Sequence, residues 1–311
     1  MTKIINQLYS VEKKIPLKIR IYRFISKILI KILFPFEKSW FRNSFVQYLN
    51  SYISLNVNDV NLKFKDGHER LNLHIGAQYV IEKDLINWID TFSKDDIFFD
   101  IGSNVGLFSI YAAKKGIQTV SFEGHYGNLH DFSYNILLND VEEKILIIPV
   151  LLAEKNEKMS FFLRDLSPSS ARSEINHKKN IYKLNNKEAL KINTATFSLD
   201  YLIENKIIPV PSKVKIDVDG AEFLVLKGFN KYLEKVNEII IEMYEKPANY
   251  WKCFKDFKSK KTIYTKNNSK NYFDDTVIKK NVYFDEIIIF LKNNSFTVMQ
   301  KFGNNIIFKK I

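Results

Sequence analysis

The sequence predicts an alternating α/β protein built on a mostly parallel β-sheet. Short apolar stretches of strand length recur through the middle of the chain, and segments with helical periodicity separate them. Nearly continuous apolar strands of this kind are typical of a sheet that is covered by helices on both faces. Glycine is scarce, at 10 among 311 residues, yet half of these glycines lie between positions 102 and 127. Such a concentration indicates that the backbone there needs unusual torsions or a close approach to another group.

The predicted elements follow one another in two series. The first contains a strand at 97–101, a helix to about residue 115, a strand at 119–123, a helix at about 128–139 and a strand at 145–152. The second contains a strand at 214–218, a helix near 221–233 and a strand at 238–243. A helix near 285–292 and strands at 296–301 and 306–309, joined by a turn at 303–304, then predict an antiparallel C-terminal hairpin added to the sheet.

Other segments surround this core. Two alternating segments between Val60 and Ile75 flank Lys65-Asp66-Gly67-His68 and predict a hairpin at the edge of the main sheet. A helix at 82–92 presents Leu85, Ile86, Trp88, Ile89 and Phe92 on one face. Residues 154–195 and 247–283 break the rhythm and are interpreted as insertions, the second as part of an acceptor-site lid. We therefore expect an extension over residues 1–58 and a catalytic domain over residues 59–311.

Composition restricts the function only weakly. Lysine and arginine number 47 against 35 acidic residues, a net charge of +12, which would suit an anionic partner. The basic residues are scattered, so drift in composition explains them better than a nucleic-acid site does. The single cysteine, Cys253, excludes a disulfide framework and a cysteine zinc site and fits a reducing, cytoplasmic setting. The longest apolar run near the N-terminus, residues 28–36, falls short of the roughly 20 residues that span a bilayer, and no secretory signal precedes it.

Residues 15–36 predict a basic amphipathic helix. Apolar residues recur there at helical spacing beside basic ones: Ile21, Phe24, Ile25, Ile28 and Leu29 beside Arg20, Arg23, Lys27 and Lys31. Two interpretations stay open. The helix either packs on the main domain, which is the commoner case, or lies in the plane of an anionic membrane surface at the inner face.

The most informative segment is the strand that ends at Asp100 and the glycine-bearing turn that follows it. Gly102 and Gly106 allow a turn close to a ligand, and the N-terminal amides of the next helix offer donors to a carboxylate. The spacing is Gly-x-x-x-Gly and differs from the Gly-x-Gly-x-x-Gly of dinucleotide folds. Asp100 suits the cationic methionine part of S-adenosylmethionine, whereas it would repel a pyrophosphate. An ordinary strand-to-helix turn is the alternative.

Two further acidic positions lie at predicted strand ends. Glu123 ends the second strand, where an acid accepts ribose hydroxyls in Rossmann-like folds. Asp217, Asp219 and Glu222 follow a third strand, and the carboxyl ends of parallel strands meet at one edge, so these acids are expected to converge with Asp100 and Glu123. Asp217 is the best candidate to orient or deprotonate an acceptor, with Asp219 and Glu222 behind it. At least one of the three is expected to act only as a helix cap.

Together these motifs resemble the FkbM family of methyltransferases over about residues 80–245. The matching residues are Phe98-Phe99-Asp100-Ile101-Gly102-Ser103-Asn104-Val105-Gly106, Ser121-Phe122-Glu123, Asn135, Asn139, Leu199-Asp200 and Lys215-Ile216-Asp217-Val218-Asp219-Gly220-Ala221-Glu222. The sequence departs from the family pattern by Asp219 where Glu is frequent and by Gly124 where Pro is frequent.

The resemblance implies a Rossmann-like class I methyltransferase sheet, S-adenosylmethionine as donor and O-methylation of a sugar, glycan or natural-product hydroxyl. It places Asp100, Gly102, Asn104 and Gly106 on the methionine side and Glu123 on the ribose. A small-molecule or glycan acceptor is expected, with no specific nucleic acid and no zinc site. Two other functions stay open: methylation of nucleic acid or protein, and membrane-surface binding with a vestigial cofactor site. The acceptor, a metal requirement and the oligomeric state are not determined by the sequence.

Overall fold

The computed structural model describes most of the chain from Tyr52 onward. The described residues are 21, 24, 25, 28, 52–66, 75, 82–163, 166–168, 173–175, 190–243, 248–249, 277–278 and 283–311. The chain divides into two compact units, Met1–Ser51 with Thr265–Asp274 and Tyr52–Tyr264 with Asp275–Ile311. The elements below belong to the second unit, and the predicted boundary near residue 58 stays a prediction. Within the part of the chain that the structure describes, no helix is long and apolar enough to cross a membrane.

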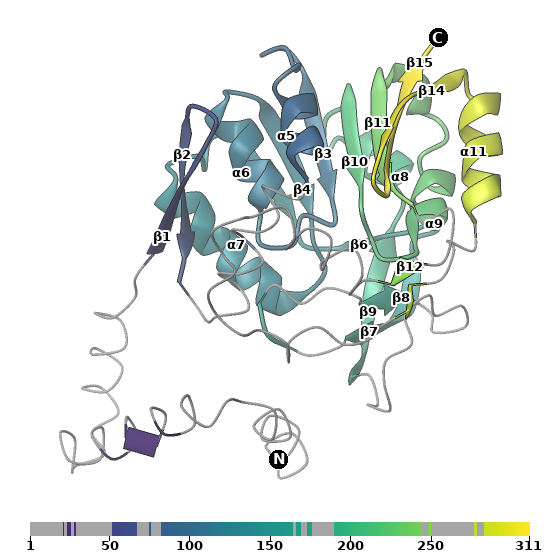
Figure 1. Ribbon diagram of the computed structural model, residues 1–311. Helices are drawn as coiled ribbons and strands as arrows, with labels where there is room; N and C mark the ends of the chain where they lie inside the picture. The colour runs from purple at the N-terminus through teal and green to yellow at the C-terminus, as the bar shows by residue number, and fades with distance from the viewer. Residues whose placement is uncertain are drawn as a thin grey trace. The chain divides into compact units, whose positions relative to one another are not determined.

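A seven-stranded sheet forms the centre of the larger unit, in the order β14-β15-β11-β10-β3-β4-β5 (Figure 1). Its strands are β3 (Ile97–Ile101), β4 (Gln118–Phe122), β5 (Ile145–Ile148), β10 (Lys213–Ile216), β11 (Glu238–Glu242), β14 (Phe296–Phe302) and β15 (Asn305–Lys310). The first five are parallel, whereas β15 is antiparallel to β11 and β14 is antiparallel to β15. The predicted α/β class with a C-terminal antiparallel hairpin is confirmed.

Apolar residues cover both faces of this sheet because successive strand residues point to opposite sides. Phe99 packs in one core with α8 (Leu199–Glu204), α9 (Glu222–Lys227) and α11 (Phe284–Asn293). Phe98 packs in the other with α5 (Lys83–Ile89), α6 (Leu107–Lys114) and α7 (Tyr126–Leu138) (Figure 1). A short 3-10 helix, η3 (Leu233–Lys235), precedes β11. The predicted apolar face is confirmed within α5, where Leu85, Ile86, Trp88 and Ile89 are buried. Phe92, the fifth predicted residue, follows the end of the helix.

The insertion after β5 forms a second sheet of four strands in the order β6-β9-β7-β8. Its strands are β6 (Leu151–Leu152), β7 (Glu157–Leu163), β8 (Glu174–Ile175) and β9 (Leu190–Phe197). The prediction of a single strand at 145–152 is therefore wrong. Strand β5 of the main sheet ends at Ile148, and β6 of the second sheet begins at Leu151. A tight turn separates them, in which Val150 N donates to the Ile148 oxygen at 2.9 Å. Of the predicted lid, the described residues show only the pairing of β12 (Ala248–Asn249) with β13 (Val277–Ile278).

The predicted N-terminal hairpin exists, but its position was wrong. β1 (Tyr52–Val57) pairs with β2 (Val60–Lys65) in a sheet of two strands that is separate from the main sheet. The turn lies at Asn58-Asp59, where Asn58 has φ 51°, a left-handed torsion that asparagine tolerates in two-residue hairpin turns. Gly67 and His68, half of the predicted turn, lie outside the described residues, and Ile75 is helical.

Two asparagines of α7 hold β2 against the main domain. The Lys63 backbone N donates to Asn139 Oδ1 at 2.9 Å, and Asn139 Nδ2 donates to the Lys63 oxygen at 2.6 Å. The Lys65 backbone N donates to Asn135 Oδ1 at 2.8 Å. Each side-chain amide therefore acts in place of a neighbouring strand.

Replacing Asn139 by alanine is expected to release β2 from α7 without unfolding the core. Loss of both bonds leaves the Lys63 backbone groups unpaired, which costs about 1–3 kcal/mol for a buried group. Hydrogen exchange at the Lys63 amide, measured by mass spectrometry, should accelerate about 10- to 100-fold. Asn61→Ala is the matched control, because the Asn61 amide bonds only to Ser54 and Asn56 within the exposed hairpin. Equal protection in the two variants would contradict this role.

Candidate active site

The candidate site lies where the chain order reverses within the sheet. From β3 the chain proceeds to β4 and β5 on one side, and then returns to β10 and β11 on the other. Ligands of open α/β sheets bind outside the carboxyl ends of the strands at such a switch point. The predicted residues Asp100, Glu123 and Asp217 all lie at this edge, on or just after β3, β4 and β10.

The β3–α6 turn has the left-handed torsions that its glycines predicted. Gly102 has φ 79° and Gly106 has φ 87°, and Asn104 between them has φ 53°. A Cβ on Gly102 would lie 1.9 Å from the Asp217 carbonyl oxygen, and one on Gly106 would lie 2.0 Å from the Phe132 ring. Both glycines are therefore required by close approach of the protein to itself. This finding adds a structural reason beside the predicted ligand contact.

Asp100 is fully buried beneath this turn. Ser109 Oγ donates to Asp100 Oδ2 at 2.5 Å, and Ser121 Oγ donates to Ser109 Oγ at 2.8 Å. The other oxygen, Oδ1, forms an ion pair with Lys215 Nζ at 3.3 Å. The carboxylate is thus held by β4, α6 and β10, and its predicted contact with a methionine amino group stays a prediction.

Glu123 joins the two loops that begin at β3 and β4. Its Oε2 accepts from the Asn104 backbone N at 2.8 Å, and its Oε1 accepts from the His125 backbone N at 2.7 Å. Burial raises the pKa of Glu123 to about 7, although hydrogen bonds from His125, Asn104 and Asn128 act to lower it. Asn104 Oδ1 is also buried and accepts no hydrogen bond from the described residues. An unpaired buried acceptor is costly, so this oxygen is suited to receive a donor from a ligand.

Asp217 is partly accessible, with a quarter of its side chain exposed. Its Oδ2 lies 3.2 Å from Lys215 Nζ. Burial and the adjacent Asp217 carboxylate, to which it is hydrogen-bonded, raise the pKa of Glu242 well above its ordinary value, and Glu82 and Asp219 add to this effect. The protonated form of Glu242 is therefore favoured, and it is the donor in the hydrogen bond with Asp217.

The other two predicted acids behave differently. Asp219 has φ 54° and precedes Gly220, which has φ 109°, so the loop after β10 turns sharply. Glu222 is buried, and its Oε1 accepts from the Gly220 backbone N at 2.8 Å at the start of α9. This contact gives Glu222 a role in holding the loop, although the N-cap residue of α9 is Ala221 and none of the three acids.

Sequence reasoning missed Lys215 and Glu242 as members of this cluster. Lys215 stands between Val214 and Ile216 in a buried strand, which is itself a signal, because lysine is rarely buried without a partner. Glu242 ends β11, and the strand-end rule that selected Glu123 and Asp217 applies to it equally.

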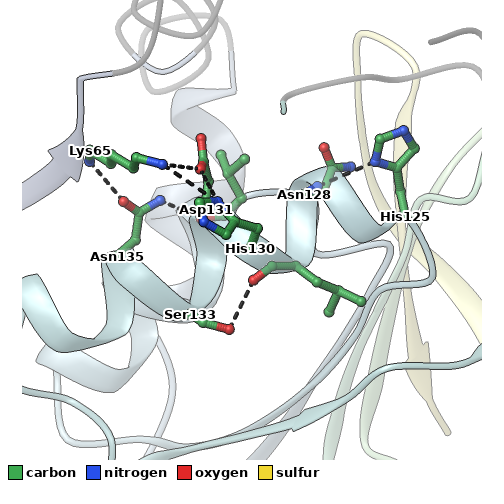
Figure 2. Close-up of polar contacts among 9 residues, drawn as sticks. Lys65, His125, Asn128, His130, Asp131, Ser133 and Asn135 are labelled. Carbon is green, nitrogen blue, oxygen red and sulfur yellow. Dashed lines mark hydrogen bonds and ion pairs between the residues drawn. The ribbon is translucent and has the colours of Figure 1, made fainter. Parts of the chain in front are cut away.

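Helix α7 connects the site to the N-terminal hairpin (Figure 2). Asn135 Nδ2 donates to the Val105 oxygen in the β3–α6 turn at 3.0 Å, while its Oδ1 accepts from β2. Asp131 is buried on the same helix and pairs with Lys65 Nζ at 2.8 Å. His125 begins the helix as its N-cap and accepts from the Asn128 backbone N at 3.3 Å. Burial and this capping bond fix the position of the His125 side chain at the start of α7.

Comparison with known proteins agrees with these motifs. Residues 100–298 match the family described as the methyltransferase FkbM domain, which is more than half of the chain. The chain belongs to this family. The predicted family is thereby confirmed. The match extends beyond the predicted 80–245 to include α11 and the start of β14.

Among curated proteins, the hexuronic acid methyltransferase AglP of Haloferax volcanii is 28% identical over 166 residues. That match covers 52% of this FkbM-family chain and 62% of the relative. Among solved structures, the magnesium protoporphyrin IX methyltransferase of Synechocystis PCC 6803 aligns with TM-score 0.42 and 8% identity over 79% of this chain and 90% of that one. The precorrin-6y C5,15-methyltransferase of Geobacter metallireducens aligns with TM-score 0.36 and 9% identity, covering 74% and 89%. The strand order described above carries the fold assignment.

The pKa of Glu123 predicts a pH dependence of stability. Because the folded-state value of about 7 lies above the ordinary 4.5, the folded protein binds this proton more tightly than the unfolded chain does. The contribution of Glu123 to the free energy of unfolding is fully present below about pH 4.5 and is lost as the pH rises through about 7, a loss of about 3 kcal/mol. Glu123→Gln removes this titration.

Urea unfolding between about pH 5 and about pH 8 checks this prediction. The stability of the wild type relative to Glu123→Gln should fall by about 2–3 kcal/mol across that range. Glu157→Gln, at an exposed position of β7, is the control and should follow the wild type. A constant difference between wild type and Glu123→Gln would show that Glu123 does not titrate in this window.

Proposed function

We propose that this FkbM-family protein transfers a methyl group from S-adenosylmethionine to a hydroxyl of a sugar or glycan. The observation that carries the proposal is the contact of Glu123 with the Asn104 backbone at 2.8 Å, because it unites the two loops assigned to the ribose and methionine ends of the donor. The family match supports the donor. The hexuronic acid methyltransferase supports a sugar acceptor and suggests a uronic acid as the first substrate to test.

The residues around Glu123 fit the donor chemically. Glu123 accepts the backbone N–H groups of Asn104 and His125 and further hydrogen bonds from Asn128 and Gly124. A ribose hydroxyl would join or replace one of these contacts to the carboxylate. The unpaired Asn104 Oδ1 suits the ammonium group of the methionine part. When bound, S-adenosylmethionine supplies an electrophilic methyl group on a positively charged sulfur.

Asp217 is proposed as the proton acceptor on the acceptor side. A sugar hydroxyl is a poor nucleophile near neutral pH, so a base that takes its proton as the oxygen bonds to carbon lowers the barrier. Asp217 is partly exposed and is held by Lys215 and Glu242. Holding the reacting groups in line supplies the larger part of the rate enhancement. Asp219 stands behind Asp217 in the same loop.

Titration calorimetry and label transfer test this proposal together. The wild-type protein should bind S-adenosylmethionine, and Glu123→Ala should weaken binding about 10- to 100-fold, since hydrogen bonds to a charged group contribute about 1.5–3 kcal/mol. With methyl-labelled donor, label should appear in glucuronic-acid-containing oligosaccharides, and Asp217→Asn should reduce transfer more than donor affinity.

Two controls accompany this experiment. Glu204→Gln, at an exposed site on α8, should bind the donor like the wild type. Transfer RNA and a mixture of unmodified peptides are offered as competing acceptors. Label in either of these instead of the oligosaccharide contradicts the sugar assignment, and absence of donor binding contradicts the whole proposal.

Peripheral contact with a membrane is proposed for the predicted helix at residues 15–36. Only Ile21, Phe24, Ile25 and Ile28 of this segment are described, and each is helical and 41–65% exposed. Their spacing places them on one helical face, and Arg20, Arg23, Lys27 and Lys31 lie beside them in the sequence. An apolar face with basic neighbours favours an anionic lipid surface. This contact would place the enzyme at the inner face of the membrane.

Vesicle flotation of the full-length protein tests the membrane contact. The double substitution Phe24→Ser and Ile28→Ser should reduce partitioning to vesicles rich in phosphatidylglycerol at least about tenfold, because each lost apolar side chain contributes about 1.5–3 kcal/mol. Ile289→Ser, at a 58% exposed position of α11, is the matched control. Equal partitioning of both variants, or no preference for anionic over neutral lipid, would refute the contact.

A further inference from the structure

Lys215 is a charged residue in the middle of a buried strand. It is 4% exposed, between the fully buried Val214 and Ile216. Burying an ammonium costs several kcal/mol unless it is closely paired. Its position therefore requires a compensating arrangement of negative groups.

The strand register supplies that arrangement. Lys215 lies directly opposite Asp100 in the parallel pairing of β10 with β3. Its Nζ is 3.3 Å from Asp100 Oδ1 and 3.2 Å from Asp217 Oδ2. One ammonium therefore connects the acid beneath the glycine turn to the acid assigned to the acceptor.

Asp217 is otherwise surrounded by carboxyl groups. Glu242 of β11 is hydrogen-bonded to it, and Glu82 and Asp219 act electrostatically on Glu242. Asp100 of β3 is the other carboxylate on the Lys215 ammonium. A nearby ionised carboxylate such as Asp100 opposes ionisation of Asp217, whereas an opposite charge within about 4–6 Å favours it. The Lys215 ammonium is placed to offset this repulsion.

We propose that Lys215 is a positioning residue, which keeps Asp217 ionised as a proton acceptor and fixes it relative to Asp100 and the glycine turn. The inference rests on the proposed role of Asp217 and deepens it. Burial acts to lower the pKa of Lys215, but the carboxylates of Asp217, Asp100 and Glu82 outweigh burial and raise it above its ordinary value. Lys215 therefore stays charged at neutral pH and does not itself take the proton.

The same strand offers a matched control. Lys213 lies two residues earlier and on the same face of β10. It is 8% exposed, and its Nζ pairs with Glu238 Oε2 at 3.1 Å, where Trp88 Nε1 also donates at 2.8 Å. Lys213→Met removes a buried ion pair of the same kind without touching Asp100 or Asp217.

The experiment compares Lys215→Met with Lys213→Met in the full-length protein. Titration of ¹³C-carboxyl-labelled aspartate by NMR, with Asp217→Asn to assign the signal, reports the ionisation of Asp217 without any acceptor. In Lys215→Met the Asp217 titration should move up by roughly 1 to 3 pH units, and in Lys213→Met it should not move. In Lys215→Met, the acid limb of the pH profile for methyl transfer to glucuronic-acid-containing oligosaccharides should shift by the same amount.

Two further variants keep the test decisive if Lys215→Met folds poorly. Lys215→Arg keeps the positive charge and should keep the Asp217 titration near that of the wild type. The double variant Lys215→Met and Asp100→Asn removes the orphaned inner carboxylate and should still show the raised titration. If Asp217 titrates as in the wild type both in Lys215→Met and in the double variant Lys215→Met and Asp100→Asn, the inference is overturned.

These outcomes also separate this inference from the proposed function. A shifted Asp217 titration without methyl transfer in the wild type supports the electrostatic role of Lys215 but removes the sugar acceptor. Methyl transfer in the wild type with an unshifted acid limb in Lys215→Met keeps the function and overturns the role of Lys215.

Discussion

The pairing of β3 with β10 is the constraint on which the candidate site depends. These strands meet at the point where the chain reverses its order across the sheet, and their register places Lys215 opposite Asp100. A buried ion pair contributes little net stability, because desolvation of both charges offsets their attraction. Its larger effect here is on orientation, since a shift of register by one residue would move Lys215 to the opposite face and leave Asp100 buried without a counter-charge.

The main sheet separates two hydrophobic cores, and the Asp100–Lys215 pair lies on one of its faces. Phe98 and Phe99 point to opposite faces of β3, and each enters a different core. Asp100 follows on the same face as Phe98, beneath α6, where Ser109 and Lys215 satisfy it. The Asp100–Lys215 pair thus lies near the carboxyl ends of β3 and β10, while the apolar residues of both cores provide the burial that stabilises the fold.

Local patterns predicted the parts of the fold that depend on local physics. Apolar runs and helical periodicity predicted the alternating elements, and the scarcity of glycine elsewhere singled out Gly102 and Gly106, which have positive φ. Features that depend on contacts distant in the sequence were missed. Lys215 meets Asp100 only through the register of β10 with β3, and the sequence around Lys215 does not predict this partner. The prediction did not include the turn at Asn58-Asp59, which lacks a glycine and joins β1 to β2.

Contacts within the protein hold the loops of the site together. Glu123 already holds the Asn104 and His125 backbones, and Asn135 links the Val105 carbonyl to β2. Under the proposed function, ribose hydroxyls would bind Glu123 beside the backbone N–H groups of Asn104 and His125. The donor would then lose its own freedom on binding while the loops lose little, and an enzyme whose task is alignment benefits from such preorganisation. Coupling of β2 to the glycine turn through Asn135 also explains why a hairpin separate from the main sheet bears on the site.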